Sequence, residues 1–145
     1  MKTIVSFNSD FPTVSENEMP VGLELSQYIY KALTKAGYQI VGPNDREGWA
    51  WDFVVQKEGY QIEAILGYVS DNQLQWLITT HAHFSLINKV FGRKVAMEKS
   101  KLEMSDFCGV INDSLSDEKF SHIRWYAQDS FDNNELDKWS SSPLA

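Results

Sequence analysis

Apolar and polar side chains alternate between positions 49 and 84, and this alternation predicts three consecutive β-strands. In the first segment, 49–56, the odd positions are apolar, and in the second, 60–68, the even positions are apolar. These positions hold Trp49, Trp51, Phe53 and Val55, then Tyr60, Ile62, Ala64, Leu66 and Tyr68. Because successive side chains of a strand point to opposite faces, each segment has one face for the core and one face free for other contacts.

The apolar faces of the three strands can be aligned from the sequence alone. A two-residue loop at Glu58-Gly59 and a three-residue loop at 71–73 set the two registers. The expected pairs are Val55–Ile62, Phe53–Ala64, Trp51–Leu66, Trp49–Tyr68, Tyr68–Trp76, Leu66–Ile78, Ala64–Thr80 and Tyr60–Phe84. A slip by one residue would put the apolar sets on opposite faces, so their agreement favours this antiparallel meander.

The first 45 residues predict a strand, a helix and a second strand. Residues 2–8 form the first strand, with Val5 and Phe7 on one face. Pro20 begins a helix that extends from Val21 to Ala36, and Gly37 follows it as a C-cap. A short strand at 38–41 ends in the turn cluster 42–45.

The last third of the chain predicts one long helix and one strand. After an apolar excursion at 85–91, the helix begins between Ala96 and Lys101. Its apolar stripe is Met104, Phe107, Cys108, Ile111 and Leu115. The final strand spans 120–126, with Ile123 and Trp125 facing inward, and a short helix is expected near 134–139 before six loose residues.

This order, βαββββαβ, predicts one α+β domain over residues 1–145. We expect a two-layer sandwich in which two main helices lie on one face of a mainly antiparallel sheet of about six strands. So few helices cannot cover both faces of such a sheet. The second face is then open, or residues 127–145 fold back over it as a covering tail.

The second face gathers the candidate functional residues. The expected register puts Glu63 opposite His81 and Gln61 opposite His83, and it places the aliphatic residues Val54, Ile65 and Leu77 nearby. If the last strand joins the same sheet, its second-face residues also point this way. The expected partner-binding set is Asp52, Glu63, Ile65, Leu77, His81, His83 and Arg124.

His81-Ala82-His83 is the cluster that most suggests metal or acid–base chemistry. Two imidazoles on one strand face could share a metal ion with Glu63 or His122, although zinc sites usually have three or four protein ligands. His81 and Glu63 could also act as a general acid–base pair. We favour exposed strand histidines with Glu63 as a cross-strand partner. No sequence motif indicates a cofactor, so none is expected.

Two further groups have a structural and a functional interpretation. Gly48-Trp49-Ala50-Trp51-Asp52 could present an aromatic platform, but the alternation favours core positions for both tryptophans. Cys108 lies on the helical stripe, which predicts a buried small side chain rather than a nucleophile.

Composition narrows the possible partners. The 145 residues include 20 acidic and 13 basic side chains, for a net charge of −7. This balance argues against nucleic acid and fits a basic protein partner. No apolar run is long enough for a membrane span, and the short apolar stretch at 4–7 predicts a strand rather than a signal peptide. The lone Cys108 favours a cytoplasmic protein.

Three short motifs resemble those of a group of small, acidic, bacterial cytosolic α+β proteins of uncharacterised function. The motifs are Pro20-Val21-Gly22, Gly48-Trp49-Ala50-Trp51 and Ile123-Arg124-Trp125-Tyr126, and the resemblance covers residues 3–126. It brings no catalytic residues. Such proteins are similar in size, charge and fold type to immunity proteins, which neutralise toxins by direct contact.

These observations favour a non-enzymatic cytosolic protein that binds a macromolecular partner through the open sheet face, as an immunity or regulatory protein does. The alternative is a metal- or small-molecule-binding protein, or an enzyme, that uses His81, His83 and Glu63. A homodimer built through the same face or an edge strand also stays open.

Overall fold

The computed structural model describes residues 1–15, 17–70, 74–85 and 93–144. Their six strands form one antiparallel sheet in the order β2-β3-β4-β5-β1-β6, which confirms the α+β prediction. The elements are β1 (Ile4–Ser9), α1 (Leu23–Lys35), β2 (Val41–Arg46), β3 (Ala50–Lys57), β4 (Tyr60–Tyr68), β5 (Trp76–Phe84), α3 (Arg93–Ser114), β6 (Phe120–Tyr126) and α4 (Gln128–Asp132).

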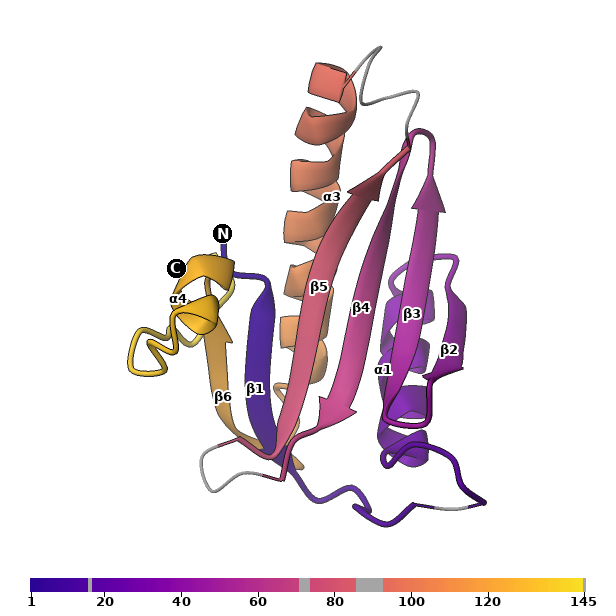
Figure 1. Ribbon diagram of the computed structural model, residues 1–145, viewed down its shortest axis with the longest axis vertical. Coiled ribbons are helices and arrows are strands. Elements are labelled where there is room, and N and C mark those ends of the chain that lie inside the picture. Colours follow the sequence, from indigo (N-terminus) through magenta and orange to yellow (C-terminus); the bar gives the residue numbers. More distant parts are fainter. Residues whose placement is uncertain (16, 71–73, 86–92, 145) are drawn as a thin grey trace.

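The core lies between the sheet and the two long helices. Figure 1 shows α1 and α3 behind the sheet, on the same side. Trp51, Leu66 and Ile78 are buried in this layer together with residues of both helices. The side-chain parity expected for the central strands is therefore confirmed, and the opposite side of the sheet is the second face.

The registers of the meander agree with the sequence prediction, except that the expected Trp49–Tyr68 pair is not formed because β3 begins at Ala50. Val55 pairs with Ile62 across β3 and β4, and Tyr60 pairs with Phe84 across β4 and β5. Glu63 is opposite His81, as expected. The turn expected at 71–73 lies outside the described residues.

The second strand differs from its prediction. It was expected at 38–41, but β2 extends from Val41 to Arg46 and pairs with β3 through an irregularity between Val41 and Asn44. As an edge strand, β2 can include Pro43, because one side of it needs no ladder hydrogen bonds. Tyr38 instead packs edge-on against Phe107 in the core.

Helix α3 begins earlier than the sequence suggested. Its buried stripe continues towards the N-terminus through Ala96 and Ser100. Both residues are small, so they do not stand out when large apolar side chains are used to find a helical stripe. The helix therefore starts at Arg93. The apolar segment expected at 85–91 lies outside the described residues, apart from Ser85.

The C-terminal tail is ordered differently from the expectation. Its short helix is α4, at Gln128–Asp132, and not at 134–139. Ser140 exchanges two backbone hydrogen bonds with Trp125, and the Pro143 carbonyl accepts one from the Lys2 amide. Ser140 is thus attached to the edge of β6, where unpaired strand groups would otherwise face water, and Pro143 is attached to the segment before β1.

Candidate functional site: the open half of the sheet

The tail covers only part of the second face. Ile4 and Tyr126 point to this face, yet both are fully buried. Phe131 of α4 packs edge-on against Tyr126, with ring centroids 5.7 Å apart. In Figure 1, α4 lies against the end of β6, on the side of the sheet away from α1 and α3. A covering tail and an open face are therefore both present, over different strands.

We call the remaining surface the open half. It consists of the second-face side chains of β2 to β5, together with Trp49 from the loop between β2 and β3. Its members include Arg46, Trp49, Asp52, Val54, Glu63, Ile65, Leu77, Thr79, His81 and His83. Six of the predicted partner-binding residues lie here.

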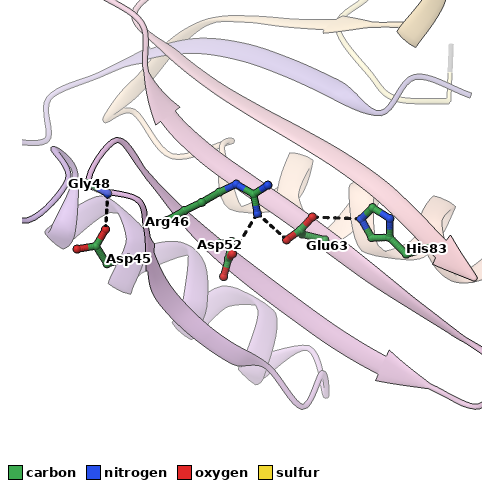
Figure 2. Close-up of polar contacts among 6 residues, drawn as sticks. All are labelled: Asp45, Arg46, Gly48, Asp52, Glu63 and His83. Atoms are coloured by element: carbon green, nitrogen blue, oxygen red, sulfur yellow. Dashed lines mark hydrogen bonds and ion pairs between the residues drawn. The ribbon is translucent and has the colours of Figure 1, made fainter. Parts of the chain in front are cut away.

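A row of polar side chains crosses the open half from β2 to β5 (Figure 2). The Arg46 guanidinium donates through Nη1 to Glu63 Oε2 at 3.0 Å and to Asp52 Oδ2 at 3.4 Å. Glu63 Oε1 is 3.1 Å from Nε2 of His83. The Asp52 and Glu63 side chains are only 16% and 14% exposed, so water screens this polar row less than an ordinary surface pair.

Arg46 is a member of this row that the sequence analysis missed. It follows a cluster of turn-forming residues, and no alternation there indicates a strand. The signal that could have found it is the three-residue connection 47–49, which makes Arg46 the register partner of Ala50. An arginine on an edge strand beside two carboxylate-bearing strands is well placed to bridge them.

Trp49 does not lie in the core, so that prediction was wrong, whereas Trp51 is buried as expected. Glu47 and Gly48 adopt left-handed φ values of 52° and 81°, which breaks the alternation before β3 begins. The Trp49 amide donates to the Arg46 carbonyl at 3.1 Å and closes the loop. The indole then lies over Gly67 on the second face, and Trp49 as a residue is 56% exposed.

Trp49 forms one wall of an apolar depression of about 290 Å³. The other lining residues are Ile65, Gly67, Tyr68, Val69, Leu77 and Thr79. Two of the three aliphatic residues expected to form a patch, Ile65 and Leu77, are therefore brought together. Val54 lies further along β3, opposite Glu63.

The three histidines do not converge. The rings of His81 and His83 are 6.3 Å apart, and Glu63 bonds His83 rather than His81, its register partner. His122 lies on β6 beside Asn8, two strands away from β5 and towards its opposite end. Within the described residues, no group of three or more His, Cys, Asp or Glu side chains is placed to hold a metal ion.

Arg124, the seventh predicted residue, is separated from the open half by β1. Its guanidinium stacks on the Trp139 ring of the tail, 5.1 Å from the ring centroid. Arg124 faces Ser6 of β1 in the sheet. It therefore helps to hold the tail and lies apart from the other six residues.

Cys108 is fully buried in α3, as its place in the helical stripe predicted. Burial raises the pKa of its thiol to about 12. The thiol therefore stays protonated near neutral pH, and a protonated thiol is a poor nucleophile.

Comparison of the chain with protein-family models, with curated proteins and with solved structures gives no match. No helix in the described part of the chain combines the length and the apolar character needed to cross a membrane. The site must therefore be interpreted from its own geometry.

Proposed function

We propose that this chain is a cytosolic binding protein without catalytic activity, which holds a protein partner on the open half. The observation that carries the proposal is the exposed indole of Trp49 beside an apolar depression, on the part of the second face that the tail leaves uncovered. Exposed tryptophans with an adjoining apolar pocket are typical centres of binding energy at protein interfaces.

The polar row supports this role. Arg46, Asp52, Glu63 and His83 hold one another in place across four strands, so the surface is ordered before a partner arrives. A preordered surface loses less side-chain entropy when a complex forms. An apolar centre beside polar groups is also the usual composition of an interface between proteins.

The same contacts favour binding over catalysis. Both oxygens of Glu63 are engaged, one by Arg46 and the other by His83. Cys108 is buried and its raised pKa keeps the thiol protonated. An immunity or regulatory role follows from this proposal, because such proteins act by covering a partner, and the net charge of −7 would speed association with a basic one.

The test compares two double variants of the tagged full chain. Glu63→Lys with Leu77→Asp changes the open half, whereas Glu98→Lys with Leu102→Asp makes the same chemical changes on α3, where Leu102 is 76% exposed. The natural partner is captured from cell extract with the wild-type chain, identified and purified. Calorimetry should then show about a thirtyfold or greater loss of affinity for the first variant, because interface centres contribute about 2 kcal/mol or more.

The α3 variant should bind like the wild type. Equal affinity of both variants for the purified partner, or loss in the α3 variant alone, would refute the assignment of the open half. Circular dichroism melting of both variants controls for unfolding, since Glu63→Lys also removes the bond to Arg46.

A further inference from the structure

We infer that the partner meets the open half with a basic segment that inserts one apolar side chain beside Trp49. This inference rests on the proposed function and names the chemistry of the partner. Three features of the open half support it: the size of the depression, the way Trp49 is held, and the excess of carboxylates around it.

The depression has the size for a side chain rather than a cofactor. Its volume of about 290 Å³ is at the lower limit of small-molecule pockets, which typically span roughly 300 to 1,000 Å³. Its walls are mainly aliphatic and aromatic, with Ile65 and Leu77 on adjacent strands, and Thr79 is the hydroxyl-bearing residue of the lining besides Tyr68. A single leucine-sized or aromatic group from a partner would bury these surfaces.

Trp49 is held in place on two sides. The Gly48 amide donates to Asp45 Oδ1 at 2.8 Å, which fixes the loop (Figure 2). Gly67 has no side chain, and a Cβ placed there would be 3.7 Å from the indole, so the ring lies close to the sheet. Because 56% of Trp49 is still exposed, its surface is available to a partner, and indole is the best aromatic acceptor for a lysine or arginine cation.

The open half around Trp49 carries an excess of carboxylates. Glu47 lies in the same loop as Trp49, and Asp52 and Glu63 lie beside Ile65 on the open half. Arg46 pairs with Asp52 and Glu63, and with Glu47 the three carboxylates and one guanidinium leave a formal excess of two negative charges. A basic segment matches this excess, whereas an acidic one would be repelled.

The experiment is an NMR titration of the ¹⁵N-labelled full chain with three short probe peptides. The probes are acetyl-Lys-Leu-Lys-amide, acetyl-Glu-Leu-Glu-amide and acetyl-Lys-Ser-Lys-amide. The first should shift the Trp49 indole N–H and the Gly67 amide with an affinity near the millimolar range, about tenfold tighter than the other two. Trp49→Ala should abolish the shifts at Gly67.

The matched control is Leu102→Ala, which removes an exposed apolar side chain beside Lys99 and Lys101 on α3 and should leave the titration unchanged. Equal shifts by all three peptides, or shifts centred on α3, would overturn the inference. Light scattering on the unliganded wild type should give the 16.6 kDa monomer. A dimer dissociated by Trp49→Ala would mean that a second copy fills the depression, which also overturns it.

The two proposals fail in different ways. If the peptides do not bind but the natural partner still depends on Glu63 and Leu77, the basic chemistry is wrong and the open half remains the binding surface. If the partner binds the variant with Glu63→Lys and Leu77→Asp as tightly as the wild type, the proposed function itself fails.

Discussion

Gly22 must be a glycine because the ring of Trp76, a residue far away in the sequence, lies against it. It precedes α1 with a left-handed φ of 100°, and a Cβ built on it would be 2.7 Å from the Trp76 ring. Gly37 follows α1 with a similar φ of 104°, but a Cβ there would meet nothing within 4 Å. A side chain at Gly37 would therefore add backbone strain alone, whereas a side chain at Gly22 would add backbone strain and a steric overlap with Trp76.

Alanine substitution should reveal this difference. Gly37→Ala should lower the free energy of unfolding by about 1 kcal/mol, the cost of a left-handed alanine. Gly22→Ala should lower it by about 3 kcal/mol, because the Trp76 ring must also move. Urea denaturation of both variants measures the losses, and equal losses would contradict the contact with Trp76.

Cys108 permits a second test at this scale. Its buried thiol, with a pKa of about 12, should react with Ellman's reagent at pH 8 on the order of a hundredfold more slowly in the folded chain than in urea. Rapid reaction of the folded protein would contradict the burial of this side chain.

The same shift makes stability depend on pH. The thiol pKa is raised from 9.0 on folding, so the folded chain holds this proton more tightly. Its contribution is fully present below pH 9 and is lost as the pH rises to about 12. Between these limits, urea denaturation should show a steeper fall in stability for the wild type than for Cys108→Ala, and parallel curves would contradict the shift.

Among the elements, the meander and the two long helices were predictable, apart from the start of α3, whereas the connection 47–49, β2 and the tail were not. Alternation determines β3 to β5, because one face must be buried and a slip would expose it. It could not place Trp49, because two left-handed residues before it turn the side chain to the other face. It also could not predict the pairing of Ser140 with Trp125, since this depends on a distant strand edge.

The tail gives the prediction at this scale. Deletion of residues 128–145 should expose Ile4 and Tyr126 and uncover the edge of β6. We expect a loss of about 3 kcal/mol, because burial of one large apolar side chain contributes about 1.5 to 3 kcal/mol, together with self-association through the free edge. Urea denaturation and light scattering measure both effects. An equally stable, monomeric truncated chain would contradict the role of the tail.

The whole molecule has three kinds of sheet surface: a face under two helices, a half-face under the tail, and the open half. The sequence predicted six of the seven candidate residues on the open half, because parity alone assigns them. It could not predict that β1 separates Arg124 from them, nor that Arg46 bridges Asp52 and Glu63, because strand order and edge pairing come from the tertiary fold. The binding proposal depends on this division of the sheet.

Cysteine accessibility in a Cys108→Ala background tests the division most directly. Single cysteines at Ile65 and Leu77 should react with a maleimide reagent on the order of a hundredfold faster than those at Leu66, Ile78 and Ile4, because only the first two are reached without opening the fold. The cysteine at Ile4 is decisive, since it shares the second face but lies beneath the tail. If it reacts as fast as those at Ile65 and Leu77, or if these two are protected, the account of an open half beside a covered half is wrong.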